Sequence, residues 1–247
     1  MEKLRGKCRR GGKARDIHEL RVILRRLRLF ASMGSPCLGK RSVRDFRAWS
    51  REVSDALGPL RDLDVTLEWL ESPSGMGETQ HELGARRAGI WLRMRSRIVP
   101  MPRRLEAALR QTGDRAKDAE HLLRQFNLVK SGLVAKLRAG LPTALLQSPQ
   151  KQHAFRRGLR RLRFLREADL SRDAQRKDPL LGLLVELHES LGNRQNTRVI
   201  VHCLRGRGHF PGKTKLLAKL RQQVEEAEPG LRAGLQRLAP CLEKMGD

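Results

Sequence analysis

Apolar residues, mostly leucine, recur at three- and four-residue spacing along most of the chain, which is the pattern of helices that bury one face. No stretch alternates apolar and polar residues over the length of a strand, so we predict an all-α protein. Glycine and proline residues separate the periodic stretches and set the expected helix ends. The expected helices span 14–32, 41–57, 60–71, 79–98, 115–139, 151–168, 178–191, 194–205, 212–227 and 230–242, with a short helix ending near 111 and a short basic tail over 1–13.

The charge of the chain points to a polyanionic partner. The 247 residues carry a formal net charge of +25, and 39 arginines outnumber 13 lysines. Nucleic acid, an anionic membrane surface and inorganic polyphosphate all present dense negative charge. Arginine suits phosphate because its guanidinium group binds two oxygens at once. A GC-rich genome is the alternative explanation for the excess of arginine over lysine, but it does not account for the net charge.

Several classes of protein are excluded. No apolar run reaches the roughly 18–20 residues of a membrane-spanning helix, and the basic first residues lack the apolar segment of a secretion signal. The four cysteines, Cys8, Cys37, Cys203 and Cys241, are scattered without a CxxC pair. This distribution argues against a disulfide framework or a zinc ribbon. We therefore expect a cytoplasmic protein without metal or cofactor.

An internal repeat is the most informative feature of the sequence. HELRVILRRLRLF (18–30) and HAFRRGLRRLRFL (153–165) share the pattern His-x-x-Arg-x-x-x-Arg-Arg-Leu-Arg at an offset of 135 residues. LGPLRDLDVTLEWL (57–70) aligns with LGNRQNTRVIVHCL (191–204) at an offset of 134 residues. We therefore predict a single domain over 14–247 that consists of two related helical halves, about 14–135 and 150–242.

Each copy of the first motif places one histidine and three arginines on one side of a helix. At about 100° per residue they fall within a stripe about 80° wide, separate from the apolar face that includes Leu24 in one copy and Phe155, Leu159 and Leu162 in the other. The first stripe is His18, Arg21, Arg25 and Arg28, and the second stripe is His153, Arg156, Arg160 and Arg163. Stacked cations repel one another unless an anion lies along them, so the stripes are candidate anion sites, with a solvated basic face as the alternative. The arginines disfavour protonation of each histidine, whereas a bound phosphate favours it.

The second motif adds Arg61, Asp62 and Asp64. Arg61 falls in the first turn of the helix after Gly58-Pro59, where backbone N–H groups also attract anions. Asp62 and Asp64 cannot contact a polyanion directly, so we expect them either to orient stripe arginines through ion pairs or to complement the helix dipole. In the second copy, Asn196 and Arg198 stand in their places. That half is expected to be more positive, with arginines that are less fixed.

These motifs resemble the CHAD domain, the conserved histidine α-helical domain. The resemblance rests on HELRVILRRLRLF followed by LGPLRDLDV, and on HAFRRGLRRLRF followed by LGNRQN, and it covers about residues 14–205. It implies two antiparallel helical bundles related by pseudo-twofold symmetry, a basic groove that binds inorganic polyphosphate, and recruitment to polyphosphate granules. Carried over by position, the binding residues would be His18, Arg21, Arg25, Arg28, Arg61, His153, Arg156, Arg160 and Arg163.

Two other functions are weighed against polyphosphate binding. Sequence-independent binding to the backbone of a duplex nucleic acid is the main alternative, because an aromatic content of 4% with no tyrosine disfavours base stacking on single strands. A phosphohydrolase would need an acidic cluster for Mg²⁺, and the sequence has none, so we expect a binding protein and not an enzyme. Arg86, Arg87 and Arg110 are taken to be exposed arginines outside the stripes.

Overall fold

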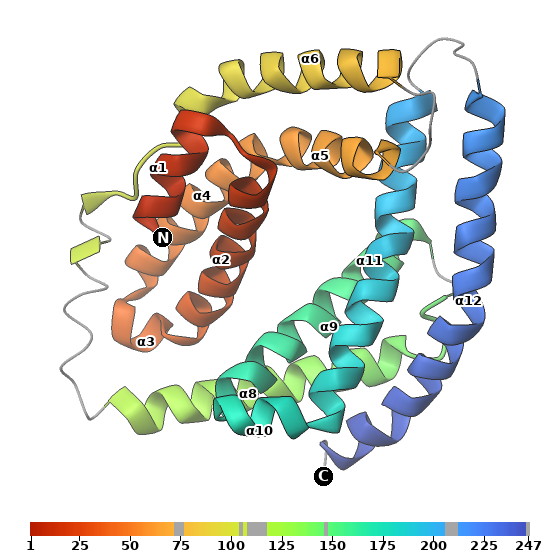
Figure 1. Cartoon of the computed structure of the whole chain (residues 1–247). Coiled ribbons are helices and arrows are strands. Elements are labelled where there is room, and N and C mark those ends of the chain that lie inside the picture. The colour runs from red at the N-terminus through yellow and green to blue at the C-terminus, as the bar shows by residue number, and fades with distance from the viewer. Residues whose placement is uncertain (72–76, 104–105, 108–117, 146–147, 206–211, 246–247) are drawn as a thin grey trace. The chain divides into compact units, whose positions relative to one another are not determined.

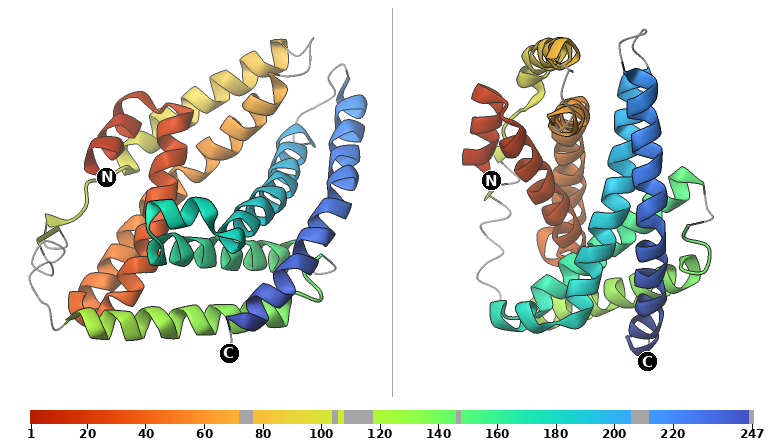
Figure 2. Two further views of the ribbon diagram at one scale, coloured as in Figure 1. Left: turned by 60° about the horizontal axis from the view of Figure 1, so that its bottom comes forward. Right: turned by 45° about the vertical axis from the view of Figure 1, so that its right-hand side comes forward.

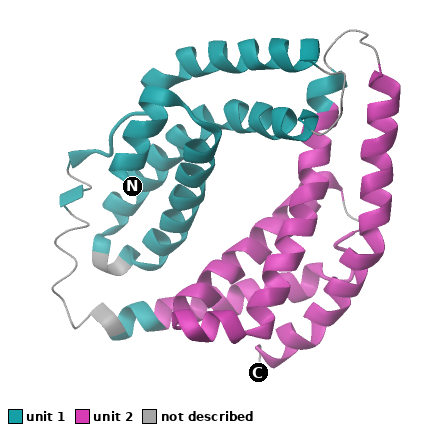
Figure 3. Ribbon diagram, viewed as in Figure 1, with its two compact units in different colours: residues 1–123, 202–210 teal, residues 124–201, 211–247 magenta. Residues whose placement is uncertain are grey.

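The computed structural model describes residues 1–71, 77–103, 106–107, 118–145, 148–205 and 212–245. All regular secondary structure in these residues is helical, which confirms the predicted all-α class. The chain divides into two compact units (Figure 3). The first unit comprises Met1–Leu123 with His202–Phe210, and the second comprises Arg124–Val201 with Pro211–Asp247. The halves expected from the repeat, 14–135 and 150–242, do not coincide with these units.

The helices of the first unit pack around one apolar core (Figure 1). They are α1 (Glu2–Gly11), α2 (Ala14–Met33), α3 (Ser35–Leu38), α4 (Lys40–Ala56), α5 (Gly58–Leu70) and α6 (Gly77–Met94), followed by the short 3₁₀ helix η1 (Arg95–Arg97). Leu20 and Leu24 of α2 are fully buried, as the helical period predicts. They lie in one core cluster with Trp49 and Val53 of α4.

Residues 1–13 are not a tail, and that expectation was wrong. Residues 2–11 form α1, whose Cys8 is fully buried in the core of the first unit. The Nε1 of Trp91 on α6 donates to the carbonyl oxygen of Cys8 at 3.1 Å, and Arg5 donates to the carbonyl oxygen of Ile98 at 3.0 Å. The helix ends at Gly11 and is capped by Gly12, which has a positive φ of 58°. The basic composition concealed this helix, because only Cys8, Leu4 and the preceding Met1 pack against the core, and the other contacts are polar and reach distant residues.

The second unit has its own core. Its helices are α8 (Asp118–Gly140), α9 (Pro149–Asp169), α10 (Arg172–Lys177), α11 (Pro179–Arg205) and α12 (Lys213–Lys244), of which α8 begins and α11 ends in residues of the first unit. Phe155, Leu159 and Leu162 of α9 are buried in this core, which confirms the apolar face predicted for the second copy of the repeat. Within the unit, α12 runs alongside α11 (Figures 1 and 2), and Arg194 of α11 pairs with Glu228 of α12 at 3.4 Å.

Two predicted helix breaks do not occur. The expected helices 178–191 and 194–205 form the single helix α11, and 212–227 and 230–242 form the single helix α12. Gly192 does not end a helix; it lies inside α11, where its lack of a side chain makes room for Arg156. Pro229 lies inside α12, where buried leucines before and after it, including Leu220 and Leu231, keep the helix against the core.

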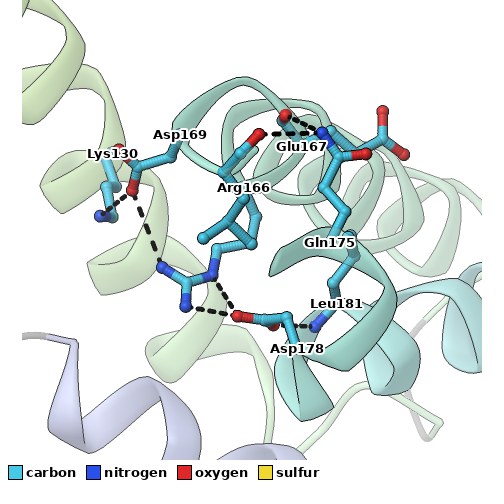
Figure 4. A network of polar contacts seen from close by, with 8 residues as sticks. Lys130, Arg166, Glu167, Asp169, Gln175, Asp178 and Leu181 are labelled. Atoms are coloured by element: carbon cyan, nitrogen blue, oxygen red, sulfur yellow. Dashed lines mark hydrogen bonds and ion pairs between the residues drawn. The ribbon is translucent and has the colours of Figure 1, made fainter. Parts of the chain in front are cut away.

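A network of polar contacts fixes the end of α9 to the start of α11 in the second unit (Figure 4). Arg166 of α9 pairs with Asp178 at 2.5 Å, and Asp178 accepts the backbone N–H of Leu181 at 2.6 Å. Asp178 directly precedes Pro179, the first residue of α11, so it caps that helix. Burial alone would raise the pKa of Asp178, but hydrogen bonds from Arg166 and from Leu181 outweigh burial and lower it.

Candidate anion-binding sites

The first stripe lies on α2, and its Arg21 contacts two neighbouring helices. The Arg21 side chain is half-buried, and its Nη1 donates to the carbonyl oxygen of Ser54 on α4. The same Nη1 lies 3.7 Å from the position that a Cβ on Gly58 would take. Arg21 therefore lies against both α4 and the first turn of α5, and a Cβ at position 58 would be at ordinary contact distance from it.

Beside this stripe is the first pocket, which has a volume of about 570 Å³. Its lining carries both signs of charge. The charged lining residues are Arg15, Arg61, Asp64, Glu68, Glu71 and Arg87, and His18 lies among them. Arg61 lies 3.9 Å from Glu68, which is itself exposed. The structure thus brings His18 and Arg61 together as predicted, but in the company of three carboxylates.

The second stripe lies on α9 and repeats the arrangement around Arg156. The Nη2 of this half-buried arginine is 3.0 Å from the position that a Cβ on Gly192 of α11 would take. Arg156 also lines the second pocket, a space of about 10 Å³, which is room for about one water molecule. The other lining residues are Gln152, His153, Leu191, Arg194, Gln195 and Arg198, with no carboxylate among the described residues that line it.

The same contact therefore occurs once in each unit. Arg21 and Arg156 hold equivalent places in the His/Arg motif, and Gly58 and Gly192 hold equivalent places in the Leu-Gly dipeptide of the second motif. In both units the guanidinium group lies over the glycine. The two sequence motifs thus occur together where the arginine of one packs against the glycine of the other, tightly in the second unit and at ordinary contact distance in the first. Pseudo-twofold symmetry between two bundles stays a prediction.

The histidines are held in their neutral form. Partial desolvation, followed by the charges of Arg61, Arg25 and Arg21, lowers the pKa of His18, although the His18 side chain remains exposed. Partial desolvation, followed by the charges of Arg157, Arg156 and Arg160, lowers the pKa of His153. These effects bear out the expectation that neighbouring arginines disfavour the charged histidine. They also show that Arg25 and Arg160 lie close enough to act on the histidine of their own stripe.

The stripe arginines farthest from the histidines are Arg28 and Arg163. Arg28 is half-buried at the far end of the first stripe. Arg163 closes the second stripe, where its Nε lies 3.1 Å from Glu167 and its guanidinium carbon lies 5.5 Å from the centre of the Phe164 ring. The second stripe is therefore partly neutralised at this end, while its pocket end is not.

The two aspartates of the second motif have different roles. Asp62 exerts an attractive charge on Arg21, which fits the predicted orienting role. Asp64 instead forms a close ion pair with Arg87 of α6, and its side chain is 2% exposed. Arg87 was taken to be exposed on sequence grounds, and that was wrong: its side chain is 19% exposed and it also donates to the carbonyl oxygen of Gly12. Arg110 lies outside the described residues.

Sequence reasoning missed three residues of the second pocket. Gln152, Arg194 and Arg198 lie within it beside His153 and Arg156. Arg198 donates to the Oε1 of Gln152 at 2.6 Å, and Gln152 is itself buried and donates to the carbonyl oxygen of Leu145 at 2.9 Å. Arg198 is thus fixed by an amide, in a half whose stripe arginines lack the two aspartates of the first half. One sequence signal could have placed Arg198 in the site: it aligns with Asp64 in the repeat.

Comparison with known proteins agrees with this repeated arrangement. The family model described as CHAD domain matches residues 1–205. The chain belongs to the CHAD domain family. This CHAD domain includes α1 in its matched region, in keeping with the packing of that helix. No curated protein and no solved structure matches the chain.

Two further findings bear on what this CHAD domain can hold. Among the described residues, no three histidine, cysteine, aspartate or glutamate side chains are grouped as a metal site would need. None of the helices in the described part of the chain is long and apolar enough to cross a membrane. The second pocket presents guanidinium and imidazole groups, which bind oxyanions, and the first pocket presents them beside three carboxylates.

Proposed function

We propose that this CHAD domain binds inorganic polyphosphate through the first and second stripes. The observation that carries the proposal is the repeated contact of a half-buried stripe arginine with a glycine, Arg21 with Gly58 and Arg156 with Gly192. A cation that serves only solubility extends into water, whereas these two lie partly desolvated beside a histidine. Partly desolvated guanidinium groups bind phosphate oxygens more strongly than exposed ones do.

Polyphosphate suits the site better than other polyanions do. The arginines and the histidine of each stripe follow one helix face over about 15 Å, a span that several successive phosphates of one flexible chain can match. The CHAD family is associated with polyphosphate binding, which supports the same ligand. Backbone binding to duplex nucleic acid is the competing function, since it would use the same cations.

The proposed activity is binding without a reaction. The arginines and histidines of the stripes can neutralise phosphate charge, but attack on a phosphoryl group also needs a positioned nucleophile and, in most enzymes, a metal ion. We accordingly expect no phosphate release from polyphosphate or ATP in the presence of Mg²⁺ or Mn²⁺. In a cell, the binding would recruit the protein to polyphosphate granules in the cytoplasm.

A competition titration tests the proposal. Fluorescent long-chain polyphosphate is bound to the protein at about 0.15 M salt, and duplex DNA is added at increasing phosphate concentration. We expect polyphosphate to remain bound when DNA is present at an equal concentration of phosphate, and its affinity to fall steeply as salt is raised. Displacement by an equal concentration of DNA phosphate would instead favour the nucleic-acid function.

A further inference from the structure

Arg156 is a partly buried cation without a counter-charge in its own unit. Within the described residues it forms no ion pair or hydrogen bond, and its Nε is fully shielded from solvent. Desolvation is the only cause that lowers its pKa, with no carboxylate acting in the other direction. Burying a charge without a partner is costly, so this arrangement favours an anion that can supply the missing charge.

The equivalent arginine in the first unit has its counter-charges built in. The carboxylates of Asp62 and Asp55 act favourably on Arg21, which also donates to the carbonyl oxygen of Ser54. In the second copy of the repeat, Asn196 and Arg198 replace Asp62 and Asp64. The substitution removes two negative charges and adds a positive one at matching positions, so the two stripes differ in their electrostatics although their histidines and arginines match.

The surroundings of Arg156 are also built to receive an oxygen atom. Arg198 is held at the pocket by the buried side chain of Gln152, and Gly192 leaves room for the Arg156 guanidinium group. Arg194 has a carboxylate partner, but it shares that partner, Glu228, with Arg232. The second pocket accommodates about one water-sized atom, while the first pocket is wide enough to stay hydrated. A single phosphate oxygen in the second pocket would meet desolvated donors, whose hydrogen bonds to an anion are strong.

We propose that the second pocket is a resident-anion site that takes a phosphoryl oxygen before the first pocket does and more tightly. The bound anion completes the charge balance of the second unit, whereas the first unit folds with its own carboxylates in that role. This inference rests on the proposed function and adds that its two stripes are unequal. The phosphoryl group can come from free inorganic phosphate or from a polyphosphate chain.

Hydrogen exchange measured by mass spectrometry tests the order of binding. The full chain is titrated with inorganic phosphate, and separately with triphosphate, at constant ionic strength maintained with chloride. We expect peptides of α9 and α11 before residue 201 to be protected at a concentration about tenfold or more below that needed for α2 and α5. Protection by inorganic phosphate identifies a site for the free ion, and protection by triphosphate alone identifies a site for chain phosphates. Equal protection of the two stripes, or earlier protection of α2 and α5, would overturn the inference.

Two matched variants separate an anion site from a structural arginine. Arg156→Gln should raise the concentration of triphosphate that protects α9 and α11 by about tenfold or more, since one charge-assisted hydrogen bond to the anion is lost. Without any phosphate, the same variant should exchange no faster than the wild type, because it removes an uncompensated charge. The matched variant Arg21→Gln should leave the protection of α9 and α11 unchanged. Faster exchange of α9 in phosphate-free Arg156→Gln would assign Arg156 a structural role and contradict the proposal.

Arg198→Gln tests the second pocket independently of Arg156. Arg198 is held by a hydrogen bond to Gln152 and is not packed over a glycine. The variant should weaken the protection of α9 and α11 by triphosphate without changing their exchange in phosphate-free buffer.

Failure of the inference differs from failure of the proposed function. If long-chain polyphosphate binds while triphosphate protects both stripes equally, the proposed function stands and the proposed difference in affinity between the stripes is wrong. If long-chain polyphosphate does not bind, the function itself is wrong.

Discussion

Arg87 of α6 forms an ion pair with the buried carboxylate of Asp64 on α5 and donates at the same time to the carbonyl oxygen of Gly12. One guanidinium group thus connects α5, α6 and the residue that ends α1. Both partners line the first pocket. The pair therefore shapes that pocket without adding net charge to it, and it stabilises the first unit whether or not an anion is bound.

Removal of the Asp64 charge is predicted to destabilise the first unit. Asp64→Asn leaves Arg87 without its buried carboxylate, which should lower the free energy of unfolding by about 3–5 kcal/mol. Asp62→Asn is the matched control, because Asp62 is exposed and should cost well under half as much. Chemical denaturation followed by circular dichroism measures both. Equal losses for the two variants would contradict the structural role given to Asp64.

Loss of one of the two stripes is predicted to weaken the binding of long polyphosphate chains by far more than half. A long polyphosphate that engages both stripes gains from the high local concentration of the second after it has bound the first. The triple variant Arg21→Ala/Arg25→Ala/Arg28→Ala should reduce affinity for long chains by about a hundredfold or more, since each charge-assisted hydrogen bond contributes roughly 1.5–3 kcal/mol. The triple at Arg156, Arg160 and Arg163 should lose more, because it removes the stripe that is proposed to bind more tightly. Fluorescence anisotropy with labelled polyphosphate gives the affinities.

The control for this experiment removes the same charge elsewhere in the first unit. The control arginines are exposed and lie outside the stripes; they are Arg47, Arg51 and Arg86. Their triple alanine variant should lose about tenfold or less in affinity for long-chain polyphosphate. If this control weakened binding as much as the stripe triples, affinity would depend on net charge alone. The stripes would then have no special part in binding.

The pH dependence of polyphosphate binding should trace to His18 and His153. Their lowered pKa values keep both rings neutral at pH 7 in the free protein, and a bound phosphate favours the protonated ring. Affinity for long chains should therefore rise as the pH falls from about 7.5 to about 5.5. The double variant His18→Asn/His153→Asn should flatten this dependence in titrations at constant ionic strength. An unchanged pH profile in the double variant would remove the histidines from the binding mechanism.

The same histidines predict the opposite trend for stability without a ligand. An unfolded histidine titrates near pH 6.5, and the folded pKa of each is lower, so the unfolded state takes up protons first. Stability should thus fall as the pH drops below about 6.5 and level off once the folded histidines are protonated. Thermal melts of the ligand-free wild type should show this loss, and the double variant should show less of it. If the melting temperatures of the wild type and the double variant fell in parallel between about pH 7 and about pH 5, the histidines would not be the cause of the loss.

Cys8 should resist thiol reagents while the first unit is folded. Burial, together with the negative charge of Asp16, raises the pKa of the Cys8 thiol to about 12, and the side chain is fully buried. Cys203 and Cys241 are partly exposed and serve as internal references. Iodoacetamide labelling with peptide mass spectrometry should modify both well before Cys8. Rapid labelling of Cys8 would mean that α1 is detached from the core in solution.

Asp178 should make the stability of the second unit sensitive to acid. Its lowered pKa means that the unfolded aspartate, near pH 3.9, takes up a proton before the folded one does. The contribution is fully present above about pH 5 and is lost as the pH falls through the folded pKa. Asp178→Asn should therefore cost about 2–4 kcal/mol at pH 7, through the lost pair with Arg166 and a weaker cap, and much less at pH 2. A difference of the same size at both pH values would exclude the ion pair as its cause.

The sequence predicts burial that arises within one helix and the meeting of residues that a repeated motif marks, and it fails for other contacts between helices. The helical period placed Phe155, Leu159 and Leu162 in the core, and the repeat brought His18 near Arg61. Gly192 looked like a helix break because a glycine that makes space for a distant arginine has no local signature. The partner of Asp64 was missed for the same reason, since Arg87 lies 23 residues away on another helix.

The division of the chain has a consequence for synthesis on the ribosome. The chain leaves the first unit after Leu123, returns to it at His202 and leaves it again after Phe210. The charge of His202 acts on Asp62, so the late segment reaches the part of α5 that follows Arg61. At a translation rate of about 5–20 residues per second, about 80 intervening residues delay the completion of the first unit by roughly 4–16 s. A nascent chain of 123 residues is thus an unfinished unit whose early helices wait for a segment that has not yet been made.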